Sequence, residues 1–375
     1  MEHYLDNAAT TKPCAAAAAV MSCISSHYGN PSSLHRKGLE AQHEVEYARN
    51  QVAGALGCKA QEIVFTSGAT ESTNLALCGA AAAYGRKRKK IITSAVEHAS
   101  VRETMAHLET LGFTVVSVPP AEDGLYHAED FLKEVDKDTC MVSIMLVNNE
   151  NGYRMPVEEV FRTVKRRDPD IITHCDAVQG FLKVSFKPRT LCADLVSLSG
   201  HKVHALKGAG ALYIRQGVRL KPVLYGSRQE KGLRPGTEGV PVIAAFGAAA
   251  EKLVLTMDER YDAVSGLRSS LIEQLKEMDG VIIRDLPSAS PYVLNISLLG
   301  YRSEIVLHYL EQREVYISSG SACSKGASSG VLELFGAKPA EVDSALRISF
   351  CSDNTEEDIA ALVQGLKDAQ KDLMH

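Results

Sequence analysis

The sequence predicts an α/β protein with a large domain, in which helices flank a mostly parallel sheet, plus a smaller α+β domain. From about residue 60 to 215, short runs rich in β-branched residues alternate with amphipathic stretches, which is typical of a parallel sheet covered on both faces. After Pro241 the pattern changes to long helical stretches followed by short strands. At about 150 residues per domain, a chain of 375 residues is long enough for two such units.

The expected strands of the large domain are 62–65, 90–94, 114–118, 140–147, 171–174, 195–197 and 211–214. Apolar residues at helical spacing predict helices over 99–111 and 157–167, where right-handed crossovers require them. The elements expected in the smaller domain are helices 244–257, 263–278 and 355–373 and strands 281–284, 292–296, 315–318 and 345–350. We expect residues 14–252 to form the large domain, and residues 1–13 and 253–375 the small one.

The composition excludes several classes of protein. Hydrophobic residues make up 45% and charged residues 23%, which disfavours disordered and coiled-coil chains. The net charge of −5 lacks the basic excess that nucleic-acid binding requires. No run of about 20 apolar residues occurs, so no membrane span is expected. The N-terminus lacks the basic and apolar regions of a secretory signal, so we expect a cytoplasmic protein.

Nine cysteines are present, an odd number, and no CxxC spacing occurs. In a reducing compartment they are expected to be free thiols, and no metal site is expected. His201 and His204 have neither a third ligand nor a HExxH frame. Cys323 differs from the other cysteines because it lies in a polar segment rich in Gly and Ser, which suits a reactive thiol.

Three segments carry candidate chemistry at the ends of expected strands. Residues 65–72 run from a strand through Gly68 into a helix, and free N–H groups at a helix start favour an anion. Asp176 and Gln179 follow a buried strand, where a carboxylate can hold a cation or a protonated ring nitrogen. Lys202, which lies 26 residues after Asp176, is a candidate imine-forming amine. Taken singly, these features are also explained by a helix cap, a strand cap and a surface lysine.

Together they are more specific, because pyridoxal phosphate needs a phosphate site, a partner for its ring nitrogen and a Schiff-base lysine. The sequence also resembles a known family along nearly its whole length. The segments that carry the resemblance are YLDNAATTKP (4–13), YGNPSSLH (28–35), EIVFTSGATESTNLAL (62–77), EH (97–98), NNENG (148–152), DAVQ (176–179), SGHK (199–202), RPGTEGVP (234–241), SSGSACS (318–324) and ALRISF (345–350). They are similar to cysteine desulfurases of the NifS/IscS type, which are fold-type I pyridoxal phosphate enzymes of the class V aminotransferase group.

The resemblance implies a role for each matching position. Lys202 would be the Schiff-base lysine, Cys323 the nucleophile that accepts sulfur as a persulfide, and His98 a ring-stacking acid or base. Arg347 would bind the substrate carboxylate, with Asn149 beside it. The remaining cofactor contacts are implied for Ala69, Thr70, Asn149, Asp176, Gln179, Ser199, His201 and, from a partner subunit, Thr237.

The implied activity is conversion of L-cysteine to L-alanine by a homodimer that passes sulfur to an acceptor protein, such as an iron–sulfur scaffold or another carrier. A selenocysteine lyase, another class V enzyme such as a transaminase, and a sulfur-relay scaffold with weak turnover remain open. The sequence departs from the family pattern in Gly226–Glu230 and at Ala205-Leu206, and the segment after Cys323 is shorter than in relatives with long loops. These departures leave the sulfur acceptor and the turnover open.

Overall fold

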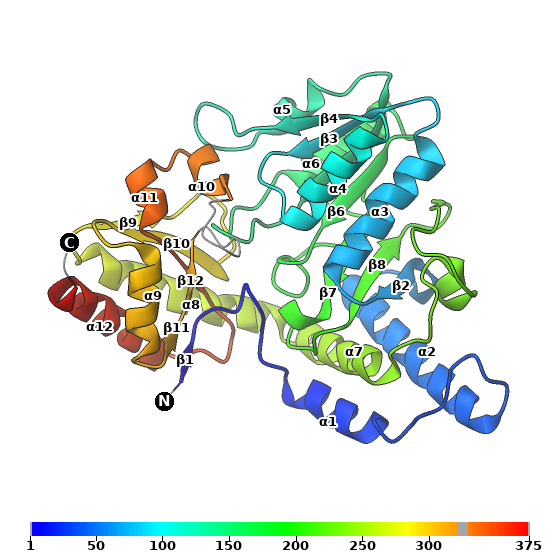
Figure 1. The fold of residues 1–375 in the computed structure, drawn as a ribbon, viewed down its shortest axis with the longest axis horizontal. Coiled ribbons are helices and arrows are strands. Elements are labelled where there is room, and N and C mark those ends of the chain that lie inside the picture. Colours follow the sequence, from blue (N-terminus) through cyan, green and yellow to red (C-terminus); the bar gives the residue numbers. More distant parts are fainter. Residues whose placement is uncertain (1, 321–328, 374–375) are drawn as a thin grey trace.

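The computed structural model describes residues 2–320 and 329–373, and its largest element is a seven-stranded sheet (Figure 1). The strand order is β2-β8-β7-β6-β5-β3-β4, and all neighbouring pairs are parallel except those that β8 makes with β2 and β7. The strands are β2 (Ile63–Thr66), β3 (Lys90–Ser94), β4 (Thr114–Val118), β5 (Thr139–Met145), β6 (Ile172–Asp176), β7 (Leu195–Ser199) and β8 (Gly210–Ile214). The predicted α/β class with a mostly parallel sheet is confirmed.

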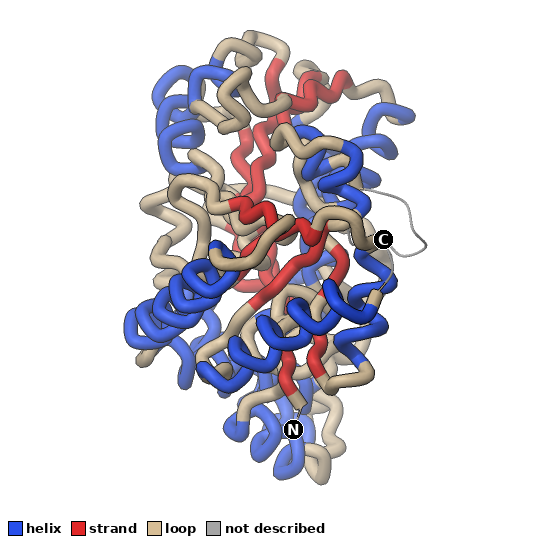
Figure 2. The backbone as a smooth tube through the Cα atoms, turned by 90° about the vertical axis from the view of Figure 1, so that its left-hand side faces the viewer, coloured by secondary structure: helices blue, strands red, loops and turns tan. Residues whose placement is uncertain are grey.

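The central strands are buried along their whole length because helices cover the sheet (Figure 2). Such strands need apolar and β-branched side chains on both faces, which explains the continuous runs in the sequence. The helices before and around this sheet are α1 (Ala15–Ile24), α2 (Arg36–Leu56), α3 (Ala69–Tyr84), α4 (Ala99–Thr110), α5 (Ala128–Leu132), α6 (Val157–Arg167) and α7 (Val240–Val254). Helix α7 packs against α1 and α2 at the lower edge of this layer (Figure 1).

A second, antiparallel sheet has the strand order β12-β13-β10-β9. Its strands are β9 (Val281–Arg284), β10 (Val293–Leu298), β12 (Ser318–Ser319) and β13 (Ala345–Ser349), and β1 (His3–Tyr4) pairs separately with β11 (Val315–Tyr316). The helices of this part are α8 (Met257–Lys276), α9 (Ser303–Glu311), α10 (Val331–Leu334), α11 (Pro339–Asp343) and α12 (Glu356–Asp372). The single strand expected over 315–318 is wrong, because its two halves pair with different sheets.

The two parts of the fold meet in sequence between α7 and α8, which are bent by 76° at a short break after Val254. Leu5, near the N-terminus, packs in the same apolar cluster as α8, β10, β13 and α12. The division at residue 252 stays a prediction. In the part of the chain that the structure describes, no single helix is long and apolar enough to cross a membrane.

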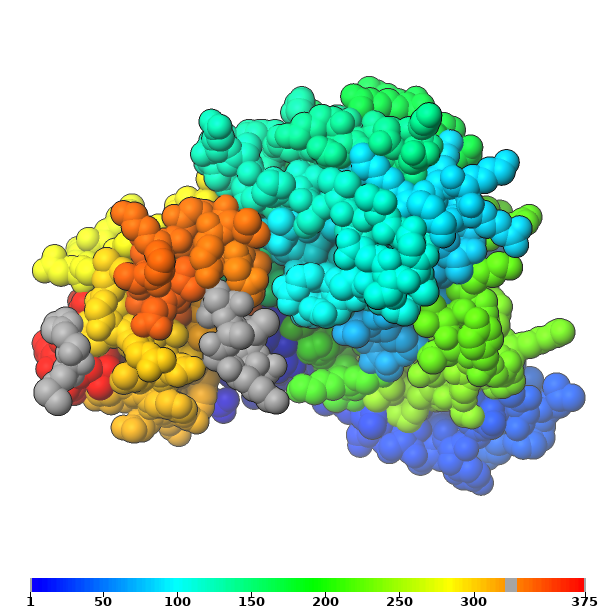
Figure 3. Space-filling view, turned by 45° about the horizontal axis from the view of Figure 1, so that its top comes forward, coloured from blue at the N-terminus to red at the C-terminus, as the bar shows by residue number. Residues whose placement is uncertain are grey.

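Contacts between distant segments also join the two parts. Phe335, at the end of α10, has its ring centroid 5.5 Å from that of Tyr153 and 6.1 Å from that of Tyr126. In Figure 3 the orange surface that includes α10 lies against the surface of the large sheet's helical layer. Strands β12 and β13 also lie beside the carboxyl ends of β5, β6 and β7, where parallel strands of α/β proteins bind ligands.

Candidate active site

A pocket of about 620 Å³ lies at the carboxyl ends of the parallel strands. The predicted site residues that line it are Ala69, Thr70, His98, Asn149, Asp176, Gln179, Ser199, His201, Lys202 and Arg347. Thr237 is exposed and does not line this pocket. Cys323 lies outside the described residues. Segments far apart in the sequence therefore meet in one cavity, although the roles assigned to them stay predictions.

Lys202 ends the short 3₁₀ turn η2 (Gly200–Lys202), which directly follows β7. Its Nζ atom donates hydrogen bonds to the carbonyl oxygens of Ala8, at 2.6 Å, and Ala9. Burial, assisted by the nearby Arg347 cation, lowers the pKa of Lys202 to about 8. A larger share of this amine is therefore unprotonated near neutral pH than for an exposed lysine, as imine formation requires.

Asp176 is the last residue of β6, so its carboxylate is held at the rim of the pocket. Its Oδ1 atom accepts a hydrogen bond of 3.0 Å from the backbone N–H of Val178. Burial raises the pKa of Asp176, while His98 and Lys202 oppose that shift. A buried carboxylate with so few donors is stabilised by a cation, and a protonated ring nitrogen is one such partner.

His98 caps the start of α4, where its Nδ1 atom lies 3.1 Å from the backbone nitrogen of Ser100. Burial lowers the pKa of His98 below its ordinary value, partly offset by Asp176. A neutral imidazole at the pocket wall can stack on a flat ring or accept a proton. This environment is compatible with the role that the resemblance implies.

Asp176→Ala is expected to keep the fold and to lose most activity, since it removes a charge-assisted hydrogen bond worth roughly 1.5–3 kcal/mol to a bound cation. This corresponds to about a 10- to 100-fold weaker hold on the cofactor. Cofactor affinity and turnover check the prediction. Asp170→Ala, in the exposed turn two residues before the same strand begins, is the matched control. If Asp176→Ala keeps near wild-type turnover with added cofactor, Asp176 serves only as a cap at the end of its strand.

Polar groups suited to a phosphate also line the pocket. Helix α3 begins at Ala69, directly after β2 and Gly68, so its first N–H groups are free to bind an anion. Ser199 Oγ is buried and, among the described residues, has no hydrogen-bond partner. A buried hydroxyl without a partner costs free energy unless a ligand satisfies it, so this atom fits a bound phosphate oxygen.

Arg347 lies in the middle of β13 and is 4% exposed. Its Nη2 atom donates to Asp6 Oδ1 at 3.0 Å and to Ser318 Oγ at 3.1 Å, and its Nη1 atom donates to the Asn149 carbonyl at 3.1 Å. Its Nε atom is buried and lacks a partner within residues 2–320 and 329–373. The guanidinium therefore has donor capacity left for a substrate carboxylate.

The structure adds groups to which the sequence analysis gave no role. Burial raises the pKa of the Glu97 carboxyl to about 8 and that of Glu150 to about 7, and both line the pocket. The carbonyls of Ala8 and Ala9, which hold Lys202, come from the N-terminal motif. Glu97 and Glu150 lie inside quoted motifs, but nothing in the sequence shows that their carboxyl groups are buried.

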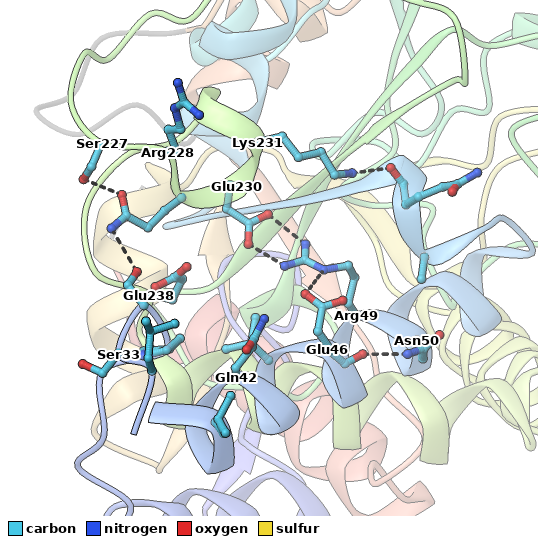
Figure 4. A pocket seen from close by; sticks show the side chains of 18 of the residues that line it. Ser33, Gln42, Glu46, Arg49, Asn50, Ser227, Arg228, Glu230, Lys231 and Glu238 are labelled. Carbon is cyan, nitrogen blue, oxygen red and sulfur yellow. Dashed lines mark hydrogen bonds and ion pairs between the residues drawn. The ribbon is translucent and has the colours of Figure 1, made fainter. Parts of the chain in front are cut away.

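The unusual segment Gly226–Glu230 lies at a separate pocket of about 990 Å³ (Figure 4). Glu230 accepts two hydrogen bonds from Arg49, at 2.6 and 2.8 Å, and a third of 2.8 Å from the backbone N–H of Phe65. Phe65 belongs to β2, which leads to Gly68 and the start of α3. The altered segment is therefore anchored through Glu230 to the strand that positions the anion cradle.

The active-site pocket offers each kind of group that pyridoxal phosphate requires of a protein: a lysine of lowered pKa, a buried carboxylate and unsatisfied donors near a helix start. The class is thus that of the pyridoxal phosphate-dependent enzymes. The family model for class-V aminotransferases matches residues 3–362, and the chain belongs to this family.

Similar proteins carry more specific names. A NifS/IcsS protein homolog of Lactobacillus delbrueckii is 40% identical over 95% of this chain and 94% of its own length. A cysteine desulfurase IscS of Dictyoglomus turgidum is 39% identical over 87% of this chain and 83% of its own. The solved structure of a NifS-like protein, 37% identical, covers 100% of both chains with a TM-score of 0.94. A structure described as SspA in complex with cysteine, 31% identical, covers 93% of this chain and 99% of its own with a TM-score of 0.81.

Proposed function

We propose that this protein is a cysteine desulfurase that converts L-cysteine to L-alanine and places the sulfur on Cys323 as a persulfide. The observation that carries the proposal is that Lys202 and Arg347 line one pocket. The pocket therefore contains both an amine of lowered pKa and a buried guanidinium. An amino acid that brings an α-amine and an α-carboxylate fits this pair. The names of the relatives, cysteine desulfurase IscS and NifS-like protein, support cysteine as that amino acid, with a thiol in its side chain.

The bound cofactor supplies an electron sink for the electron pair left when the substrate Cα–H bond breaks. Arg347 binds the substrate carboxylate and so orients Cα. Lys202, as a free amine, takes the Cα proton and later returns a proton to the product. Asp176 would hold the ring nitrogen of the cofactor by balancing its charge, and Gln179 would donate a hydrogen bond to its phenolic oxygen.

Sulfur transfer is assigned to Cys323 from the sequence resemblance. Its thiolate attacks the substrate sulfur, so an S–S bond forms as the Cβ–S bond breaks, and the electron pair of that bond is retained by the carbon skeleton. Protonation of this skeleton gives alanine. A reductant or an acceptor thiol then removes the outer sulfur from Cys323.

Partners and location belong to the same proposal. The exposed position of Thr237, away from the pocket of its own chain, suits a residue that reaches the cofactor phosphate of a second copy in a homodimer. The acceptor is a protein of iron–sulfur cluster assembly or another thio-cofactor pathway, in the cytoplasm. The names NifS and IscS among the relatives support that class of acceptor.

The test is an assay with L-cysteine as sole amino acid and a thiol reductant. We expect alanine and sulfide to form in equal amounts. Conversion of cysteine to its keto acid, with the sulfur retained and neither alanine nor sulfide formed, would point to a transaminase. Cofactor absorbance without alanine would point to a relay scaffold. No reaction of cysteine, with release of selenide in a parallel assay in which selenocysteine replaces it, would point to a selenocysteine lyase. Each of these three results would contradict the proposal.

A further inference from the structure

Lys183 is a buried cation that the proposed mechanism does not use. It follows β6 in the turn after Gln179 and is 5% exposed. Its Nζ atom donates a hydrogen bond of 2.9 Å to Gln179 Oε1 and lies 5.8 Å from the centre of the Tyr292 ring. Lys183 itself does not line the active-site pocket, whereas Gln179 does.

The surroundings of Lys183 do not stabilise a charge. Burial, together with the nearby cations Lys202, Arg260 and Arg347, lowers the pKa of Lys183 to about 7, while Cys351 opposes the shift. Within the described ranges, no carboxylate forms an ion pair with Lys183. A buried ammonium whose hydrogen bond goes to a neutral amide is costly, so this lysine is a poor stabiliser of the fold.

Its hydrogen bond does, however, settle the orientation of the Gln179 amide. The carbonyl oxygen of Ala8 is an acceptor only, and it lies 2.9 Å from Gln179 Nε2. Lys183 Nζ lies on the other side of the amide, where it donates to Oε1, and in its protonated form it can only donate. If the amide were flipped, its NH₂ group would face the ammonium and its oxygen would face a carbonyl. Only one orientation is therefore compatible with both neighbours.

In that orientation one Nε2–H of Gln179 is left without a partner in the part of the chain described. The same Ala8 oxygen also accepts the hydrogen bond from Lys202 Nζ at 2.6 Å. Lys183, Gln179, Ala8 and Lys202 thus form one continuous chain of hydrogen bonds that ends on the reactive amine. A change at Lys183 reaches the pocket through this chain.

We propose that Lys183 is a positioning residue, which fixes the Gln179 amide so that an N–H donor, and not the carbonyl oxygen, faces the cofactor. This inference rests on the proposed contact between Gln179 and the cofactor's phenolic oxygen. That oxygen carries negative charge and needs a donor. Without Lys183, the Gln179 oxygen loses its partner and only the Ala8 carbonyl still orients the amide, so the donor is held less firmly toward the cofactor.

The test is a double-mutant cycle on the binding of pyridoxal phosphate to the apoenzyme, with Lys183→Met, Gln179→Ala and both together. We expect Lys183→Met alone to raise the dissociation constant about three- to tenfold, the usual size for one hydrogen bond. In the Gln179→Ala background the same change should have no further effect. The absorbance maximum of the bound cofactor should shift in Lys183→Met relative to the wild type. In the double variant it should be the same as in Gln179→Ala.

Lys187→Met, an exposed lysine four residues later, is the matched control and should leave both readouts unchanged. Because Lys183→Met removes a buried charge, its melting temperature should not fall below that of the wild type. If it does not fold, Lys183→Gln is used in the same cycle.

If Lys183→Met weakens cofactor binding equally in the Gln179→Ala background, Lys183 acts on the fold alone. If it weakens cofactor binding in neither background, Lys183 has no role. Either result overturns the inference. If Gln179→Ala itself leaves cofactor affinity and absorbance unchanged, the assignment of Gln179 fails, and the inference falls with it. If Gln179→Ala has its effect and Lys183→Met has none, the proposed function stands and only the inference is wrong.

Discussion

Lys202→Ala is expected to lower the rate of alanine formation from L-cysteine by about 10³-fold or more, since it removes both the covalent attachment of the cofactor and the base that moves the Cα proton. The protein should still fold, because the hydrogen bonds of Lys202 in the described part of the chain go to two backbone carbonyls and not to another side chain. Borohydride treatment of the wild type should attach the cofactor to Lys202. Attachment to Lys207, which also lines the pocket, would contradict the assignment.

The lowered pKa of Lys202 gives this reaction a pH dependence. The amine attacks only when it is unprotonated, so the rate of cofactor attachment to the apoenzyme should rise with pH and level off above about 8. With an ordinary lysine the rise would continue to about 10.4. Lys207→Ala is the control, and its profile should match the wild type.

Cys323→Ser is expected to stop sulfide release, by about 10³-fold or more, because a hydroxyl is a far weaker nucleophile than a thiolate. Binding of the cofactor and of L-cysteine should persist, since the proposal assigns these steps to Lys202, Asp176 and Arg347. Cys23→Ser, at an exposed position on α1, is the matched control and should keep full activity. Desulfurase turnover in Cys323→Ser would refute the proposed nucleophile.

Other cysteines are poorly placed to replace it. Burial raises the pKa of Cys351 to about 11 and holds that of Cys175 well above its ordinary value. The pKa of Cys58 is also raised, to about 12, by burial and by the nearby Glu62. Thiols with raised pKa values are largely protonated near neutral pH and are poor nucleophiles.

Much of the fold could be predicted because periodicity is a local property. The strands over 90–94, 114–118 and 281–284 and the helix over 157–167 have the predicted bounds in the structure. Strand β7 extends two residues past the predicted end, because Leu198 and Ser199 continue to pair with β8. Serine has no strong preference for strands, so pairing with a distant neighbour decides where such a strand ends.

The positions of candidate site residues could be predicted where a motif places a chemical group at a strand end, as for Asp176 and Lys202. Their contacts could not be predicted where they join distant segments. The restraint on Lys202 comes from Ala8 and Ala9, more than 190 residues earlier. Asp6 accepts a hydrogen bond from Arg347, which lies 341 residues later in the sequence. The burial of Glu97, and the burial of Lys183 without a carboxylate partner among the described residues, likewise follow from tertiary packing. No local sequence pattern predicts such packing.

The central claim is that the sulfur of L-cysteine passes to Cys323 as alanine forms. The most direct measurement is a single turnover without reductant, in which alanine is quantified and the persulfide is located by alkylation and peptide mapping. The account predicts one alanine per active site and a persulfide on Cys323. Alanine formed with no persulfide on Cys323, or with the persulfide on Cys351 or Cys175, would contradict it.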